Sequence, residues 1–303
     1  MKSYDVVILT EAQYINPKKI DWYIENVLTE DRLIQEALEN KGLRVIKKDW
    51  ADTNFDWSTT KLVLFRTTWD YYNRYEEFSK WLKSSTNQTI HINSSSIIKW
   101  NMDKKYLKVL EEEGVNIPET EFITKGSKTT LEEIHSKNNW YKTVLKPTFS
   151  GGGRHTYKLN LESLSTHEDL FQELVMKEDM MLQVFQNNIV EKGEMSLIMI
   201  DGEYTHSVLK VAKEGDFRVQ DDFGGSVHEY KPSSEEIDFA KKTIAACPEK
   251  PIYARVDIFL DNNNKLALGE LELIEPELWF RNNHNAADKL ADSIYNQYFC
   301  TNN

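Results

Sequence analysis

Residues 253–276 read YARVDIFLDNNNKLALGELELIEP, and this stretch constrains the fold of the chain more than any other. Two apolar-rich segments, Tyr253–Leu260 and Lys265–Ile274, flank the turn-forming run 261–264, a pattern that predicts a β-hairpin. Side chains on a strand alternate between its two faces. We therefore expect Arg255 and Asp257 to share one face of the first strand, and Glu270 and Glu272 to share one face of the second.

The three carboxylates of this hairpin are candidate metal ligands. Buried on neighbouring strands, they would repel one another unless a cation neutralised them. Hard oxygen ligands suit Mg²⁺, which takes one or two protein carboxylates together with waters and substrate phosphates. The alternative is a solvated hairpin whose acidic face points at water. The first interpretation predicts a magnesium site built from Asp257, Glu270 and Glu272.

Size and charge restrict the class of protein. The 303 residues suffice for two or three domains, and 40% of them are hydrophobic, which is typical of a soluble globular protein. The net charge of −12 argues against a general nucleic-acid binder or a membrane-surface binder. Cys247 and Cys300 form no CxxC pair, and we see neither a signal-peptide pattern nor an apolar run of transmembrane length. These features favour a cytoplasmic protein.

The order of elements predicts three domains. A strand at 4–10, a helix at 30–41 and strands at 43–47, 62–66 and 89–93 indicate a parallel α/β sheet, which we close at residue 98. A second domain, 99–185, should contain a helix at 102–113, strands at 120–123 and 143–146, and the glycine run. A third, 186–303, should contain strands at 194–200 and 203–211, a helix at 233–246, the hairpin and a helix at 285–295.

The chain contains one glycine cluster, which follows a lysine at the end of a strand. Lys146 precedes Ser150, Gly151, Gly152 and Gly153 by a few residues. A loop with free backbone N–H groups beside a lysine is suited to covering the phosphates of a nucleotide. The run matches neither the Walker loop nor the dinucleotide fingerprint, and a flexible turn is the alternative.

Further cations arise at the ends of elements in this acidic chain. Arg218 lies in FRVQDDFGGS, residues 217–226, and arginine gives planar, bidentate recognition of phosphate or carboxylate. Lys210 ends the strand before it, and Lys104 lies in the second predicted domain. A surface arginine in a hairpin loop is the alternative for Arg218. Together these residues predict a cleft that receives phosphates.

Four motifs, in this order and spacing, resemble the ATP-grasp superfamily in its glutathione-synthetase-like branch. They are VLKP (144–147), FRVQDDFGGS (217–226), RVD (255–257) and GELELIEP (269–276). Three longer phrases, FRTTWDYY (65–72), IKWNMDKKYL (98–107) and GELELIEPELWF (269–280), are similar to the bacterial group that contains the D-cycloserine-forming O-ureido-serine cyclo-ligase. The resemblance covers nearly the whole chain.

The resemblance implies an α/β and α+β protein: an N-terminal Rossmann-like (pre-ATP-grasp) domain followed by two ATP-grasp subdomains that hold ATP between them. It implies that Lys104 and Lys146 are the two lysines that contact the phosphates and adenine of ATP, beside the glycine loop. Gln183, Val184 and Phe185 would recognise adenine, and Glu191 or Glu194 the ribose. Lys210 and Arg218 would stabilise the transferred phosphoryl group. Asp257, Glu270 and Glu272 match the Mg²⁺ ligands, although related enzymes often have asparagine at the position of Glu272.

The implied activity is ATP-dependent carboxylate–amine ligation through an acylphosphate, which releases ADP and phosphate. The partners would be amino-acid-like or peptide substrates, and relatives are often dimers or tetramers, which leaves a homo-oligomer open. An ATP-binding phosphotransferase of the same fold and a catalytically inactive nucleotide-binding regulatory protein are the alternatives. Retention of the whole charged set disfavours an inactive relative.

For substrate recognition we expect Arg66 with Trp69, Asp70 and Tyr71, because Arg66 ends a strand of the first domain, where ligands of open sheets bind. The guanidinium would hold a carboxylate and Asp70 an amino group. The alternative is an arginine that pairs structurally with Asp70 and stacks on Trp69. Glu275 and Arg281, just beyond the metal strand, are further candidates to face an amino-acid-like substrate.

Overall fold

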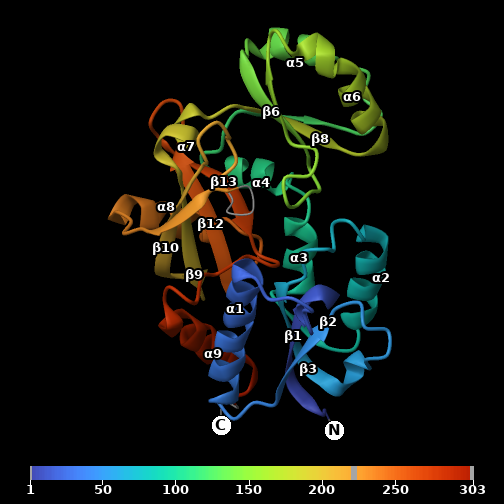
Figure 1. Cartoon of the computed structure of the whole chain (residues 1–303), viewed down its shortest axis with the longest axis vertical. Helices are drawn as coiled ribbons and strands as arrows, with labels where there is room; N and C mark the ends of the chain where they lie inside the picture. Colours follow the sequence, from blue (N-terminus) through green and yellow to red (C-terminus); the bar gives the residue numbers. More distant parts are fainter. Residues whose placement is uncertain (1, 220–223, 301–303) are drawn as a thin grey trace.

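The computed structural model describes residues 2–219 and 224–300, which form three β-sheets with helices packed against them. In Figure 1 the sheet of the N-terminal segment lies at the bottom, the sheet of the middle segment at the top, and the sheet of the C-terminal segment beside both. Within the described residues, no helix combines the length and apolar character needed to cross a membrane.

The first sheet is parallel, as its strand–helix–strand sequence predicts, with the order β2-β1-β3-β4. Its strands are β1 (Tyr4–Thr10), β2 (Val45–Asp49), β3 (Thr60–Thr67) and β4 (Ile90–Ile92). Its helices are α1 (Trp22–Glu39) and α2 (Tyr75–Ser85), with short 3₁₀ helices η1 (Ala12–Tyr14) and η2 (Trp57–Thr59).

Helix α1 begins eight residues earlier than expected. The Asp21 side chain caps it by accepting the N–H groups of Tyr23 and Ile24, and exposed residues such as Trp22 weaken the apolar pattern of its first turns.

The middle sheet is antiparallel, with the order β5-β8-β6-β7. Its elements are β5 (Thr120–Ile123), α5 (Leu131–Asn138), β6 (Lys142–Pro147), β7 (Tyr157–Asn160), α6 (Leu164–Lys177) and β8 (Met180–Val184). Helices α5 and α6 lie together on one side of the sheet (Figure 1) and share a hydrophobic core with it. The glycine run lies between β6 and β7, at the edge that faces the rest of the protein.

The third sheet is also antiparallel, with the order β11-β10-β9-β12-β13. Its elements are α7 (Asn187–Lys192), β9 (Glu194–Ile200), β10 (Glu203–Val211), β11 (Ser226–Glu229), α8 (Ser234–Ala245), β12 (Tyr253–Leu260), β13 (Leu266–Glu272) and α9 (His284–Tyr298). The expected hairpin is present as β12 and β13. Strand β12 lies between the central strand β9 and the edge strand β13, and Val256, Ile258, Leu268 and Leu271 of the hairpin belong to a hydrophobic core.

The helix expected at 102–113 is present in shortened form as α4 (Tyr106–Glu112), and another short helix, α3 (Ser95–Asn101), precedes it. The chain turns between them because Asp103 Oδ1 accepts the backbone N–H of Lys105 at 2.9 Å, while the N–H of Lys104 bonds the carbonyl of Thr148 at 2.8 Å. This break places Lys104 beside the loop that follows β6. Tyr106, Leu107 and Leu110 pack into the core of the third sheet rather than that of the middle one.

The C-terminal segment returns to the first sheet. Helix α9 lies alongside α1 (Figure 1), and Leu290 and Ile294 share one hydrophobic core with Val6, Leu62 and Ile198. The core therefore joins the first sheet to the third across the expected boundaries. The division at residues 98 and 185 stays a prediction.

Candidate active site

A cleft of about 710 Å³ lies where the three sheets meet, and residues from all three line it. Strand β6 and the glycine loop contribute one wall, and β10, β12 and β13 contribute the floor. Loops that follow β1 and β3 of the first sheet close one end. Every site residue predicted from the sequence lines this cleft, except Glu191, Arg66 and Arg281.

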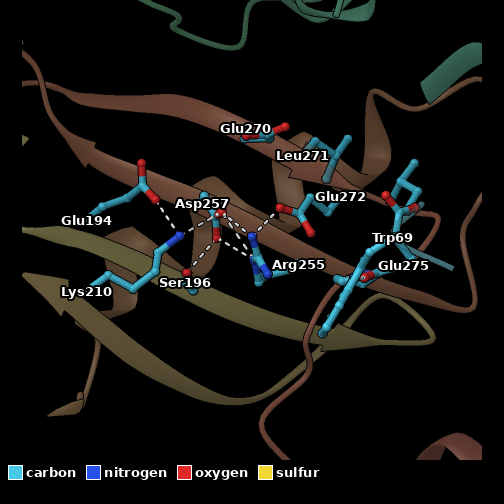
Figure 2. A network of polar contacts seen from close by, with 12 residues as sticks. Trp69, Glu194, Ser196, Lys210, Arg255, Asp257, Glu270, Leu271, Glu272 and Glu275 are labelled. Atoms are coloured by element: carbon cyan, nitrogen blue, oxygen red, sulfur yellow. Dashed lines mark hydrogen bonds and ion pairs between the residues drawn. The ribbon is translucent and has the colours of Figure 1, made fainter. Parts of the chain in front are cut away.

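The hairpin register sets the geometry of the floor. Asp257 pairs with Glu270 and Arg255 pairs with Glu272 across β12 and β13, so all four side chains lie on one face. Asp257 is 2% exposed, and it accepts hydrogen bonds from Ser196 Oγ at 2.6 Å and from Lys210 Nζ at 3.0 Å. Figure 2 shows these contacts converging on Asp257.

Each carboxylate of the floor faces a cation. Arg255 Nε donates to Asp257 Oδ1 at 3.0 Å, and Arg255 Nη2 also bonds Glu272. Glu270 pairs with Lys104 at 2.9 Å. Among residues 2–219 and 224–300, no set of three acidic, histidine or cysteine side chains is already arranged around a metal position. In this structure the negative charges of the three floor carboxylates are therefore neutralised by neighbouring lysine and arginine side chains.

The pKa values of the three acids differ because the cations are unequally shared. Burial raises the pKa of Asp257, but Arg255 and Lys210 outweigh burial and hold it at about 2. Burial is likewise outweighed at Glu270, where Lys104 and Lys146 lower the pKa. Burial and the negative charges of Glu270 and Asp257 raise the pKa of Glu272 to about 7. The positive charge of Arg255 lowers this pKa but does not offset them. Asp257 and Glu270 are thus the two acids most stabilised as anions.

Lys210 connects two buried acids. Its Nζ lies 2.5 Å from Glu194 Oε1 and 3.0 Å from Asp257 Oδ2, and the lysine side chain is 4% exposed. The neighbouring backbone of Gly269 approaches closely, since a Cβ there would lie 3.1 Å from Glu194 Oε2. Glu194 is therefore fixed in the cleft by charge and by packing.

The glycine loop lies against the first sheet's side of the cleft. A Cβ on Gly151 would come within 2.7 Å of the Tyr72 ring, so only glycine allows this approach. Lys104 Nζ donates to the carbonyl of Ser150 at 2.9 Å, which holds the start of the loop. Lys146 lines the cleft under the loop, and burial lowers its pKa. Within the described part of the chain Lys146 makes no salt bridge.

The hinge Gln183–Phe185 is held by the hairpin turn. Asn262 Nδ2 donates to the carbonyl of Phe185 at 2.9 Å, and Asn262 Oδ1 accepts the N–H of Asn187 at 2.9 Å. Gln183 Nε2 donates to Thr120 Oγ1 at 2.9 Å. The asparagine-rich turn, which the sequence indicates only as a turn, thus positions the segment expected to recognise adenine.

Replacing Asn262 by alanine is expected to raise the KM for ATP by about tenfold with little change in the KM for the acid substrate, since two hydrogen bonds worth about 1 kcal/mol each are lost. Asn263→Ala is the matched control, because the exposed Asn263 makes its hydrogen bond to Asp261 through the backbone N–H alone. Steady-state kinetics of both variants measure the effect. An unchanged KM for ATP in Asn262→Ala would exclude a positioning role for this side chain.

Arg218 forms a salt bridge with Asp216 at 2.8 Å and lines the cleft beside Phe217. Phe217 in turn contacts Phe185 of the hinge, with ring centroids 6.0 Å apart. The central part of the motif FRVQDDFGGS, residues 220–223, lies outside the described residues.

Three residues expected in the site lie elsewhere. Arg66 is 1% exposed and does not line the cleft; its Nη2 donates to the carbonyl of Pro276 at 2.8 Å and lies 3.4 Å from Glu30. Arg66 therefore has a structural partner, as the alternative interpretation expected, but this partner is Glu30 and not Asp70. Arg281 pairs with Glu277, and Glu191 is exposed on α7, so neither lines the cleft.

The Glu30–Arg66 pair fixes the segment after β13. Glu30 also accepts the N–H groups of Leu278 and Phe280 at 2.8 Å. The interaction holds residues 276–280 against the first sheet, which is why an arginine at the end of β3 is buried. Sequence reasoning places Arg66 at the end of the strand but cannot supply the partner that covers it.

Trp69, Asp70 and Tyr71 do line the cleft. Asp70 accepts hydrogen bonds from Trp50 Nε1 at 2.7 Å and from Arg74 Nη1 at 2.6 Å. Trp69 Nε1 donates to the backbone carbonyl of Glu275 at 2.9 Å. Of the residues expected to recognise the substrate, Trp69, Asp70, Tyr71 and Glu275 therefore line the cleft, whereas Arg66 and Arg281 do not.

Sequence reasoning omitted several residues of the cleft from its site. The sequence indicates the position of Arg255, because this residue lies two positions before Asp257 in the RVD motif and so shares its face of the strand. Among the others are Glu11, Gln13, Tyr14, Tyr23, Tyr72 and Glu277. Residues 11–23 belong to a loop and to the first turn of α1, where no periodic pattern indicates which side chains point into a cleft.

Two family models match the chain. One, described as prokaryotic glutathione synthetase, ATP-grasp domain, matches residues 109–261, which is half of the chain. The other, described as the N-terminal domain of D-cycloserine synthetase DcsG, matches residues 6–93.

Similar proteins agree with these matches. Cycloserine biosynthesis protein DcsG of Streptomyces lavendulae is 24% identical over 280 residues, which cover 86% of this chain and 90% of that protein. The crystal structure of D-cycloserine synthetase DcsG has a TM-score of 0.84 at 21% identity, covering 96% of this chain and 99% of that one. The ATP-grasp ligase PsnB complexed with minimal precursor, Mg and ADP has a TM-score of 0.63 at 15% identity, covering 98% and 99%.

Proposed function

The chain belongs to the ATP-grasp ligases that contain the ATP-grasp domain of prokaryotic glutathione synthetase. We propose that it joins the carboxylate of an amino-acid-like or peptide substrate to an amine. The reaction passes through an acylphosphate and releases ADP and phosphate. The observation that carries the proposal is the cleft in which the three carboxylates of the hairpin and four cationic side chains from outside the hairpin meet a glycine loop. The cations are Lys104, Lys146, Lys210 and Arg218.

The floor of the cleft fits Mg²⁺ in its donor chemistry. Asp257 and Glu270 are opposite one another in register and are the two acids stabilised as anions. Two carboxylates supplemented by phosphate oxygens and water are what Mg²⁺ usually takes. Asp257 and Glu270 would hold the ion, with Glu272 as a third oxygen ligand. When bound, Mg²⁺ neutralises negative charge on the phosphates of ATP.

The chain's own cations provide the remaining charge neutralisation. Lys146 has no salt-bridge partner within the described residues and binds a phosphate of ATP. Lys104 leaves its salt bridge with Glu270 and binds a second phosphate. Lys210 and Arg218 neutralise the phosphoryl group during its transfer. Residues 150–153 cover the phosphates and exclude water, which would otherwise hydrolyse the acylphosphate.

The opposite end of the cleft suits the nucleoside. Gln183, Val184 and Phe185 present the hinge to adenine. Of the two glutamates expected near the ribose, Glu194 lines the cleft and Glu191 does not, so Glu194 takes this role in the proposal.

The test is a screen of ADP release with amino acids offered singly and in pairs, followed by mass spectrometry of the products. We expect ADP only when an acid and an amine are both present, and a product lighter by one water than the sum of the two. A stable phosphorylated product formed from one substrate alone would instead establish the phosphotransferase. No ADP with any combination, from a chain that binds ATP, would establish the inactive regulatory protein.

A further inference from the structure

One end of the cleft lies outside the positions proposed to bind ATP. It consists of Tyr14, Tyr23, Trp69, Tyr71 and Glu275, here called the aromatic end, and these residues all line the cleft. In Figure 2 the charged side chains extend from Glu194 and Lys210 through Asp257 and Arg255 to Glu272, and Trp69 and Glu275 lie beyond Glu272. The aromatic end therefore adjoins the metal-site carboxylates on the side away from Lys210.

Glu275 is anchored through its backbone, and one oxygen of its carboxyl group has no hydrogen-bond partner in the described structure. Its backbone carbonyl accepts Trp69 Nε1 at 2.9 Å. Its Oε2 is shielded from water and has no hydrogen-bond partner in the described structure. A shielded carboxylate oxygen without a donor is costly, and burying a donor beside it removes that cost.

The surroundings disfavour the anion until a cation arrives. Burial and the nearby charge of Glu272 raise the pKa of Glu275 to about 8, although the Tyr71 hydroxyl favours the charged form. Four basic side chains of the cleft pair with acids other than Glu275: Lys104 with Glu270, Lys210 with Asp257, Arg218 with Asp216, and Arg255 with both Asp257 and Glu272. A positive charge supplied by the ligand would complete the site.

The rings at this end suit the same kind of group. Trp69 contacts Tyr14 edge to face with ring centroids 5.7 Å apart, and it contacts Tyr23 at 6.2 Å. Aromatic faces attract ammonium ions through the quadrupole of the ring, and tryptophan does so most strongly. An acidic group beside clustered rings is thus a receptor for an ammonium group rather than for a carboxylate.

We propose that Glu275 receives the ammonium group of the acid substrate, so that the chain selects amino acids, and peptides with a comparably placed amine, over acids that lack a positive charge. The inference rests on the proposed function and deepens it. The acid's carboxylate must lie at the metal-site end, where the phosphoryl group is transferred. Glu275 follows the metal-site residue Glu272 by three residues and lines the same cleft.

The experiment compares matched acids by ADP release. The probes are α-amino acids that support turnover, together with the same acids in deaminated, 2-hydroxy and N-acetyl form. The wild-type chain is expected to prefer the free amine by about 10- to 100-fold in kcat/KM, the range that one hydrogen bond to a charged group provides. Equal rates for amino and deaminated acids would overturn the inference and leave the ligase standing, whereas no ADP with any acid would contradict the proposed function itself.

Substitutions at Glu275 separate binding from structural support. Glu275→Gln should raise the KM of the amino substrate about 10- to 100-fold, remove the preference for the free amine, and leave the KM for ATP unchanged. Glu275→Asp keeps the charge and should retain most of the preference. If both variants lower kcat and raise the KM for ATP alike, Glu275 supports the fold and the inference fails. The wild-type substrate series decides the question even if the variants do not fold.

Discussion

Replacing Glu270 by glutamine is expected to lower kcat by about 10²- to 10³-fold, the loss seen when one preorganised electrostatic contact to a reacting group is removed. Glu270 lies opposite Asp257 on the floor of the cleft and is held as an anion by Lys104 and Lys146. Glutamine keeps the shape but neutralises one of the two carboxylates best able to bind Mg²⁺. The measurement is single-turnover ADP release with saturating ATP and acid.

Glu272→Gln is the matched control for this substitution. Burial raises the pKa of Glu272 to about 7, so the folded protein disfavours the charged form of this side chain. The pKa of Glu270 is lowered, so the folded protein favours its charged form. Neutralising Glu272 should therefore raise the unfolding temperature near pH 8 and cost less turnover, whereas Glu270→Gln should lower the unfolding temperature. Equal turnover in Glu270→Gln and the wild type would count against a metal role for this acid.

Replacing Lys210 by methionine should affect stability and activity together. The substitution leaves Glu194 and Asp257, both buried beside Lys210, without the cation they share at 2.5 and 3.0 Å. Removing one partner of a buried ion pair typically costs about 3–5 kcal/mol of unfolding free energy. It also removes a cation from the transferring phosphoryl group, so turnover should fall by at least about 10²-fold. Denaturant unfolding and ADP release measure the two effects.

A second substitution distinguishes these effects. In the double variant Lys210→Met/Glu194→Gln one of the uncompensated charges is gone, so a large part of the stability should return while turnover stays low. Recovery of turnover along with stability would mean that Lys210 acts only as a structural counterion. Unchanged stability in the single variant would mean that the two carboxylates are neutralised by something other than Lys210.

The sequence predicted the floor of the cleft better than its walls. Alternation along β12 and β13 places Arg255, Asp257, Glu270 and Glu272 on one face, because a two-residue period is local information. The pairing of Asp257 with Lys210 is not local, since it depends on the position of β9 between β10 and β12. Only the folded sheet shows that one lysine serves two acids.

Long-range contacts also explain the errors. Arg66 lies at the end of a strand, as expected, but Glu30 of α1 and the carbonyl of Pro276 turn it away from the cleft. The helix expected at 102–113 begins only at Tyr106, because the backbone N–H of Lys104 bonds the carbonyl of Thr148. Asn262 resembles an ordinary turn residue until the turn meets the hinge at Phe185.

Asp257 and Glu270 are expected to form, with bound nucleotide, a single Mg²⁺-dependent site. Isothermal titration with a non-hydrolysable ATP analogue tests this expectation most directly. The wild-type chain is expected to bind one analogue per chain with Mg²⁺ present, and to lose at least about tenfold in affinity when Mg²⁺ is removed or when Glu270 is glutamine. Binding of equal affinity with and without Mg²⁺, unchanged in Glu270→Gln, would contradict the account.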